Sequence, residues 1–316
     1  MNIFSRFGRK LTFTKNDLPF SIEKYSSHLL ASLLTMAWFV EARDPYTGGH
    51  LWRVSRYARL LAEYAGETDT DAARISLGGF LHDLGKIGIP DAILRKTDRL
   101  TDEEYEIIKT HPDMGYRMLS GHPLAALVKD AVLLHHERPD GQGYPRKLSG
   151  IEIPVMARIV GICDAFDAMT SHRPYRPGMP KDKALAIIRN FSGTQFDAHY
   201  AAVFIQLDES GQLDHVIGHS DEGIPLQSCP MCGPTLVIQH EHKAGDHIYC
   251  RNCSSEFSLE NQNRQLIAQP TGKKGQPADL EPELDAALIA RTVQAAVAAL
   301  PIEALLSTSD LNISIP

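Results

Sequence analysis

Apolar residues recur at helical spacing along the first two thirds of the chain. Between about residue 21 and residue 210 they return every three or four positions, and alternation of apolar with polar residues is nearly absent. The longest apolar stretch, residues 28–40, is interrupted by polar side chains and stops at Glu41. A membrane span needs about 20 apolar residues, so this stretch predicts a buried helix. We expect an all-helical domain over residues 21–210, after an N-terminal extension of residues 1–20.

Local signals predict where some of these helices begin. Thr101 and Glu104 have the spacing of a capping box. Pro154 is suited to the first turn of a helix, because a proline there loses no intrahelical hydrogen bond. Pro112 disfavours helical angles at the residue before it, so we expect His111 at a helix end.

The pattern changes after Gly211. Short segments rich in Gly, His and Cys surround two stretches with β propensity, 236–238 and 247–249, which predicts a small β module over residues 211–265. Residues 266–283 have the composition of a linker. Residues 284–316 predict a helical tail.

One face of that tail is apolar. The residues that share it at helical spacing are Ile289, Val293, Ala296 and Leu300. The expected fold class is therefore mainly α, an all-helical domain followed by a small β module and a helical tail.

Composition narrows the class of protein. Hydrophobic residues make up 43% of the 316 residues and charged residues 22%, with a formal net charge of -7. These values fit a globular protein and exclude a disordered or fibrous one. The mild acidity gives no broad basic field, so nucleic acid is an unsupported partner. The N-terminus lacks the apolar run of a signal peptide, and we expect a cytoplasmic protein without a membrane span.

Imidazoles and carboxylates concentrate between residues 50 and 164. The set is His50, His82, Asp83, His111, His135, His136 and Asp164. Such nitrogen and oxygen donors suit Fe, Mn or Zn. Neighbours in a helix point about 100° apart, so the adjacent pairs suit two ions or a helix end. Spacing alone leaves open that these residues only pack in the core or lie on the surface.

The sequence around these residues is more specific. The motifs in order are HLWRV at 50–54, LHDLGKIGIP at 81–90, HP at 111–112, HHERPDGQGYP at 135–145 and DAFD at 164–167. Together they closely resemble the HD-GYP family, a branch of the HD-domain metal-dependent phosphohydrolases. The resemblance runs from about residue 21 to residue 210.

This resemblance implies a phosphodiesterase that cuts cyclic di-GMP to linear pGpG, and in some members onward to GMP. Two divalent ions, Fe or Mn by family preference, would lower the pKa of a shared water and neutralise phosphate oxygens. The ligands it implies for one ion are His50, His82, Asp83 and Asp164. Asp83 would bridge to a second ion held by His111, His135 and His136.

The resemblance also implies contacts for the substrate phosphates. Lys86 would lie beside the metal site as a point charge for a phosphate oxygen. Arg173 and Arg176 match phosphate-binding arginines, whose planar fork suits two oxygens, although surface charge is the alternative. Asp167 would orient Lys86 or a metal-bound water.

The glycine-rich loop at residues 141–145 has several interpretations. Gly143 would permit a close backbone approach, and Tyr144 would offer its ring or hydroxyl to guanine. The same loop is linked in the family to docking on diguanylate cyclase domains, and its chemistry alone is that of a turn.

One position departs from the family pattern. Some members have a glutamate four residues before the first metal histidine, where it helps to hold a third ion, but this chain has Tyr46. A phenol is a poor substitute for a carboxylate around hard cations. Glu41 lies elsewhere in the pattern and is not a replacement. We therefore expect a binuclear site, and the step from pGpG to GMP loses support.

Two cysteine pairs indicate a second metal site. Cys229 and Cys232 are separated by 17 residues from Cys250 and Cys253, a spacing that suits one tetrahedral structural Zn²⁺. The alternative is a redox dithiol or a disulfide pair. A small β module that binds one Zn²⁺ in this way is a zinc ribbon, and similar ribbons contact proteins or nucleic acids in other families.

Two other functions remain open. The first is hydrolysis of another cyclic dinucleotide or phosphodiester, because the ligand set defines a reaction more sharply than a base. The second is an interaction protein that acts through the glycine-rich loop, the ribbon or the tail. The sequence leaves the native metal, the regulatory input and homo-oligomer formation undetermined.

Overall fold

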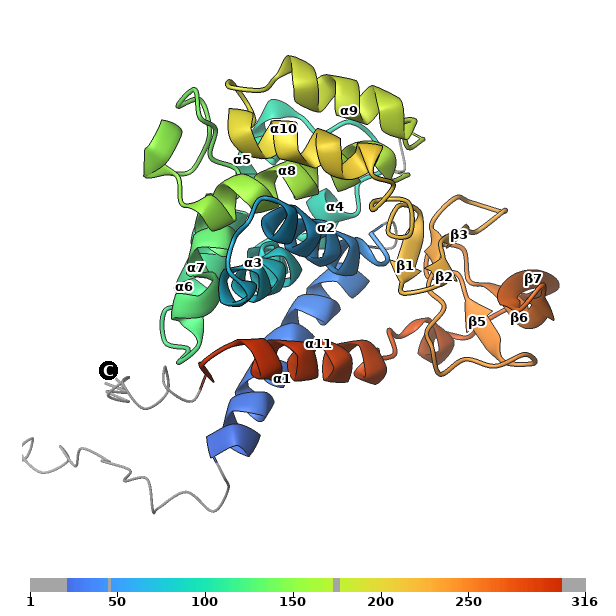
Figure 1. The fold of residues 1–316 in the computed structure, drawn as a ribbon. Helices are drawn as coiled ribbons and strands as arrows, with labels where there is room; N and C mark the ends of the chain where they lie inside the picture. The colour runs from blue at the N-terminus through green and yellow to red at the C-terminus, as the bar shows by residue number, and fades with distance from the viewer. Residues whose placement is uncertain (1–21, 45–46, 173–176, 303–316) are drawn as a thin grey trace, which may run out of the picture.

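The computed structural model describes residues 22–44, 47–172 and 177–302 (Figure 1). A helical body comes first in the chain, small antiparallel sheets follow it, and a last helix returns to the body. This arrangement confirms the predicted mainly α class with a small β part after the helices.

The helical body is built from helices and two short 3-10 segments. In chain order these are α1 Ile22–Ala42, α2 His50–Tyr64, α3 Asp69–Leu81, η1 Leu84–Gly88, α4 Asp91–Leu94, α5 Asp102–Ile108, α6 His111–Leu119, α7 Ala125–Leu134, η2 Gly150–Glu152, α8 Val155–Thr170, α9 Lys181–Asn190 and α10 Ala198–Glu209. Among the described residues, no helix has both the length and the apolar character needed to cross a membrane.

The predicted helix starts hold with one small shift. Thr101 and Glu104 form the capping box, in which each side chain accepts the other's backbone N–H. His111 is the first residue of α6. Pro154 lies one residue before α8 rather than in its first turn, because its ψ of 147° is extended.

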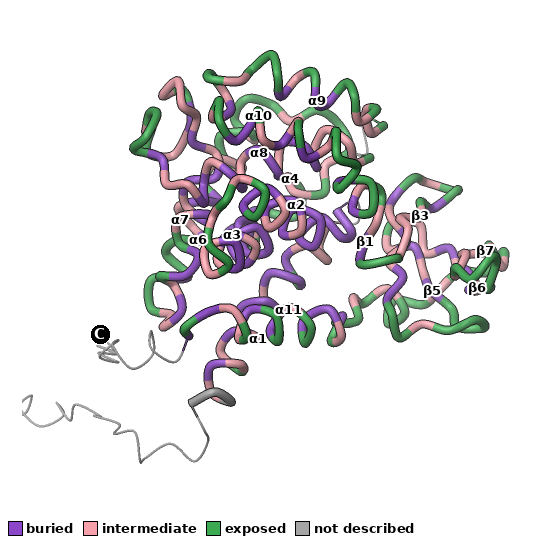
Figure 2. The backbone as a smooth tube through the Cα atoms, in the orientation of Figure 1, coloured by how far each residue is buried: buried purple, intermediate pink, exposed green. Residues whose placement is uncertain are grey.

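The core of the body lies where α2, α3, α7 and α8 pack together. Figure 2 shows the buried positions gathered along α2 and α3. Tyr57 and Phe166 meet edge to face with ring centroids 5.4 Å apart, and Phe204 lies 5.0 Å from Phe166. Burying one such ring contributes about 1.5–3 kcal/mol, so this cluster fixes the position of α8 relative to α2.

The ribbon module, defined here as residues 219–274, contains the strands. They are β1 His219–Asp221, β2 Ile224–Pro225, β3 Gln227–Ser228, β4 Thr235–Leu236, β5 His247–Tyr249, β6 Ser255–Gln262 and β7 Gln265–Lys274. All pairings are antiparallel, in the orders β1-β2, β3-β4 and β5-β6-β7. The module has its own small core, centred on Phe257 and Leu259.

The predicted linker over residues 266–283 is wrong for its first half. Residues 265–274 form β7, which pairs with β6 after a tight turn at Asn263 and Arg264, both with positive φ. Leu266 and Ala268 pack against the module core. The glycine and lysine content that suggested a linker belongs to an exposed edge strand. The short segment η3 Pro277–Leu280 follows it.

The predicted tail helix is α11 Ala286–Ala299, and it is part of the main core. It packs against α1 and α3. Three of the four residues predicted from the sequence, Ile289, Val293 and Ala296, are buried on this helix, and the fourth, Leu300, is buried directly after its last residue. Residues 303–316, the rest of the predicted tail, lie outside the described residues.

Candidate active site

The seven predicted ligands come together, six of them at helix ends and one within a helix. His50 is the first residue of α2 and His111 the first of α6, while Asp164 lies within α8. The two doublets, His82-Asp83 and His135-His136, directly follow the last residues of α3 and α7. Both doublets therefore lie at helix ends, where neighbouring side chains can turn toward one point.

Backbone carbonyls orient three of the imidazoles. The Nδ1 distances are 2.7 Å from His82 to Gly79 O, 2.8 Å from His111 to Ile108 O and 2.7 Å from His135 to Ala131 O. A carbonyl oxygen only accepts, so each Nδ1 donates its hydrogen. In a neutral ring the lone pair then lies on Nε2, the atom that binds a metal.

Asp83 lies between two groups of imidazoles. Its Oδ2 is 3.5 Å from His50 Nε2 and 3.4 Å from His82 Nε2. Its Oδ1 is 3.4 Å from His111 Nε2. The two oxygens thus face different partners, as a carboxylate that bridges two cations would.

The ligand atoms fall into compact groups. One contains His50, His82 and Asp164, another contains His111, His135 and His136, and the atoms within each group lie within 4.8 Å of one another. A further group, His82, Asp83 and His135, links the two, and Asp83 therefore lies between them.

Two features of these side chains fit bound cations. His82 Nε2 is buried and has no hydrogen-bond partner among the residues that the structure describes. His111 Nε2 and His135 Nε2 lie 3.2 Å apart. Because both rings donate from Nδ1, the two Nε2 atoms face each other as lone pairs, which is unfavourable without a cation nearby.

Electrostatics differs between the two groups. Burial opposes a charge on His82, but Asp83 and Asp164 outweigh it and raise its pKa to about 10. Burial lowers the pKa of His111 to about 4 and that of His136 to about 3. The first group is therefore dominated by carboxylate charge, whereas the second presents neutral imidazoles.

Asp167 has a different partner from the one predicted. Its Oδ2 accepts from His50 Nδ1 at 2.8 Å, and its Oδ1 accepts from Arg53 Nε at 2.5 Å. It therefore holds a candidate ligand in place, while Lys86 Nζ lies beside Asp83. Arg53, to which the sequence analysis gave no role, lies three residues after His50 on the same helix face.

Lys86 lies where the sequence predicts a phosphate contact. It is in η1, one turn after Asp83, and its Nζ is 2.6 Å from Asp83 Oδ2. The side chain is 26% exposed, so the ammonium reaches the surface of the candidate site. Burial alone would raise the pKa of Asp83, but Lys86 and His82 together hold it well below its usual value.

Close packing explains why residue 143 is a glycine. A Cβ at this position would lie 2.4 Å from Arg138 N and 2.5 Å from Glu137 Cα, so the close approach is to the chain's own backbone. Glu137 also holds this loop, because its carboxylate accepts from the backbone N–H groups of Arg146 and Leu148. The sequence analysis gave Glu137 no role.

Tyr144 lies against the candidate ligands. Its ring stacks on His136, with centroids 4.7 Å apart and an interplanar angle of 26°. Lys109 Nζ is 5.4 Å from the centroid of the same ring. Burial raises the pKa of the Tyr144 hydroxyl, which stays neutral and able to donate a hydrogen bond.

Three residues singled out from the sequence, Tyr46, Arg173 and Arg176, lie outside the described residues. Glu41 is described, and it caps a helix. Its two carboxylate oxygens accept from the backbone N–H groups of Gly49 and Leu51, each at 2.7 Å.

The four paired cysteines form a separate cluster in the ribbon module. The Sγ separations include 3.7 Å between Cys229 and Cys253 and 3.5 Å between Cys232 and Cys250. None of the chain's cysteines forms a disulfide. Tetrahedral Zn–S bonds of about 2.3 Å place sulfurs about 3.8 Å apart, which fits this cluster. Cys163 is buried in α8.

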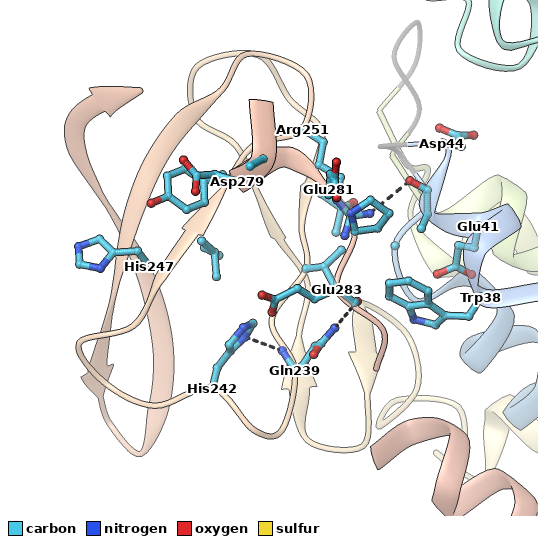
Figure 3. Close-up of a pocket in the computed structure, with 18 residues that line it drawn as sticks. Trp38, Glu41, Asp44, Gln239, His242, His247, Arg251, Asp279, Glu281 and Glu283 are labelled. Carbon is cyan, nitrogen blue, oxygen red and sulfur yellow. Dashed lines mark hydrogen bonds between the residues drawn. The ribbon is translucent and has the colours of Figure 1, made fainter. Parts of the chain in front are cut away.

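A cavity of about 410 Å³ lies between α1 and the ribbon module (Figure 3). Carboxylates contribute much of its lining, among them Glu41, Asp279 and Glu283. None of the seven candidate ligands lines it, so it is separate from the candidate active site.

Comparison with known proteins gives the family. A family model described as "HD domain" matches residues 35–200. The chain is 39% identical over 188 residues to the Cyclic di-GMP phosphodiesterase of Thermotoga maritima, an alignment that covers 59% of this chain and 51% of that protein. It is 40% identical over 189 residues to the Cyclic di-GMP phosphodiesterase response regulator RpfG of Xanthomonas campestris, with 59% and 50% covered.

A third relative has a different stated substrate. The chain is 40% identical over 182 residues to the 3'3'-cGAMP-specific phosphodiesterase 3 of Vibrio cholerae, which covers 56% of this chain and 39% of that protein. The chain thus spans about half or less of the length of these relatives. The family match and the ordered motifs lead to one conclusion: the chain belongs to the HD domain family, in its HD-GYP branch.

Proposed function

We propose that this chain is a metal-dependent phosphodiesterase that hydrolyses cyclic di-GMP to linear pGpG. The observation that carries the proposal is the convergence of imidazole Nε2 atoms and carboxylates from helices that are far apart in sequence. The names of the Thermotoga and Xanthomonas relatives support the substrate.

Two divalent ions are part of this proposal. His50, His82 and Asp164 would hold one, His111, His135 and His136 the other, and Asp83 would contribute one oxygen to each. Fe²⁺ and Mn²⁺ suit this mixture of imidazole and carboxylate. When bound, such ions supply Lewis-acid stabilisation of phosphate charge and activation of water.

The chain's own residues supply the remaining functions. Asp167 holds the His50 ring through Nδ1, so that Nε2 faces inward. Lys86 presents its ammonium beside Asp83, where it would pair with a phosphate oxygen. From the family pattern, we assign Arg173 and Arg176 to the substrate phosphates. Tyr144 would contact a guanine through its ring edge or its neutral hydroxyl.

The cysteine cluster is proposed as a structural zinc site. Cys229, Cys232, Cys250 and Cys253 would provide four thiolates, the ligand set of a closed zinc site. No further ligand is then needed from the histidines of the module.

A second candidate substrate is 3'3'-cGAMP, favoured by the named specificity of the Vibrio relative. The candidate metal ligands would hold the ions, and the ions would contact phosphate and water, so this part of the site does not distinguish guanine from adenine. Discrimination between these bases would come from the loop that contains Tyr144.

The test is a time course with protein purified anaerobically and loaded with Fe²⁺ or Mn²⁺. Cyclic di-GMP and 3'3'-cGAMP are compared, and pGpG and GMP are separated by chromatography, with Asp83→Ala as the blank. We expect metal-dependent accumulation of pGpG. Faster cleavage of 3'3'-cGAMP would favour the second substrate, and no turnover of either by fully loaded protein would contradict the proposal.

A further inference from the structure

We infer that Arg53 is a positioning residue that ties the His50 side of the candidate metal centre to the ribbon module. The inference rests on the proposed metal site. It assigns a function to the part of the chain beyond the match to the HD domain model, which ends at residue 200.

One side of the Arg53 guanidinium holds Asp167. Nε lies 2.5 Å from Asp167 Oδ1, and Nη2 lies 3.1 Å from Oδ2. This is the two-pronged pairing that fixes both the position and the plane of a carboxylate. The same Oδ2 accepts from His50 Nδ1, so the Asp167 plane sets the direction of the His50 ring.

The other side of the guanidinium holds the ribbon module. Arg53 Nη1 donates to His219 O at 2.8 Å and to Gly48 O at 3.1 Å. His219 is the first residue of β1 and lies 166 positions after Arg53. Arg53 is only 2% exposed, so these partners replace water almost completely.

The backbones themselves are also in close contact here. A Cβ on Gly49 would lie 2.4 Å from Ser220 Cα, and Gly49 has a φ of 75° that favours glycine. The start of α2, which carries His50, therefore packs directly against β1. A displacement of β1 would therefore shift Arg53 and the first turn of α2.

Further contacts hold β1 and its module against the body. The Asp221 carboxylate, with a 4% exposed side chain, pairs with Arg291 of α11. Arg251 donates to Ala42 O at the end of α1, and Gln239 donates to the carbonyl of Glu283 ahead of α11 (Figure 3). The module is thus held against the body by contacts at β1 and at residues that follow β1 in the chain.

The consequence is a specific effect on metal binding. Partners that orient a ligating histidine typically change metal affinity by about 10–100-fold when they are altered. Loss of the Arg53 contacts should weaken the ion held by His50, His82 and Asp164. The other three histidines do not orient their rings through Asp167. The affinity for the ion that they would hold should therefore change little.

The first experiment measures Mn²⁺ binding alone, without nucleotide, in the full chain. We compare Arg53→Lys with Arg59→Lys, a matched control on α2 whose surface pair with Glu63 is remote from Asp167. Electron paramagnetic resonance titration should show one ion bound about 10-fold more weakly in Arg53→Lys, and both ions unchanged in Arg59→Lys. The melting temperature of the metal-free protein is recorded to separate this effect from general destabilisation.

Unchanged affinity of both ions in Arg53→Lys would overturn the inference. Equal weakening of both ions together with a lowered melting temperature would also overturn it, because that pattern indicates a structural role only. The proposed function fails separately: wild-type protein that binds two Mn²⁺ but cleaves no cyclic dinucleotide would refute the activity and leave this inference standing.

A second variant tests the anchor in the module and remains informative if Arg53→Lys does not fold. Asp221→Asn removes the charge that pairs with Arg291 and should weaken the same ion several-fold. In the Arg53→Lys background that loss should disappear, because coupled residues give non-additive effects. No loss from Asp221→Asn, or additive losses, would overturn the role of the module.

Discussion

The two candidate metal centres are organised in opposite ways. The ligands at the helical centre are oriented by packed helices and by Nδ1 hydrogen bonds to carbonyls and to Asp167. The four cysteines lie outside the strands of the ribbon module, around a core much smaller than that of the body. The comparison teaches that the first site is built by the fold, whereas the second would help to build it.

The largest expected effect is zinc loss from the ribbon module. Cys250→Ser should remove the zinc and unfold the module, because structural zinc contributes about 10–16 kcal/mol to small zinc domains. Zinc quantification in Mn²⁺-loaded protein and limited proteolysis within residues 219–274 check this. Met231→Ser, at an exposed position between two of the cysteines, is the control and should keep the zinc. If Cys250→Ser kept its full zinc content and its resistance to protease, the ribbon module would not depend on this cysteine or on zinc for its folding.

The second largest effect is expected at the helical centre, and it should not involve unfolding of the protein. Asp83→Ala should lower turnover of cyclic di-GMP by a factor on the order of 10³, because it removes one ligand from each proposed ion. The helical circular dichroism signal and the zinc content should stay unchanged. Asp98→Ala, at an exposed site, serves as the control. Substantial turnover in Asp83→Ala would mean that this carboxylate does not bridge.

Lys86 separates substrate charge from metal binding. Lys86→Met should lower kcat/KM for cyclic di-GMP by about 10²-fold, since one cation facing the phosphate is lost. Both Mn²⁺ ions should still bind. Lys129→Met removes an exposed lysine on α7 and should leave the rate unchanged. A variant at Lys86 that cleaves normally would assign the phosphate charge to other residues.

The smallest effect concerns Tyr144. Replacement by Ala should raise KM by about 2- to 10-fold, because an aromatic contact is worth roughly 0.5–1.5 kcal/mol. Tyr144→Phe keeps the ring over His136 and should change KM by less than about 3-fold if stacking dominates. Steady-state kinetics with cyclic di-GMP decides this. Equal losses in both variants would show that the hydroxyl, not the ring, makes the contact.

The sequence predicted the elements that depend on local pattern. Helical periodicity identified the body, and the His and Asp doublets identified a ligand set that the structure brings together. Residues 266–274 were misinterpreted as a linker, because exposed strand residues have the composition of a linker and only pairing with β6 reveals them.

Contacts between distant parts of the chain were beyond the sequence pattern. Arg53 belongs to a recognised motif, yet one of its partners is the backbone carbonyl of His219. Every residue has such a carbonyl, so the sequence does not show which one accepts the hydrogen bond. The contacts of Asp167 with His50 and Arg53 were missed for the same reason. Its neighbours in space come from α2, while the pattern around it suggests only a helix.

The position of α11 has a consequence for synthesis in the cell. Thr70 in α3 donates to Ala299 O, a contact between residues 229 positions apart. At roughly 5–20 residues per second, α3 emerges from the ribosome about 10–50 s before its partner helix exists. During that interval the apolar surfaces of α1 and α3 that α11 covers are exposed, so this interval is when the nascent chain most needs a chaperone.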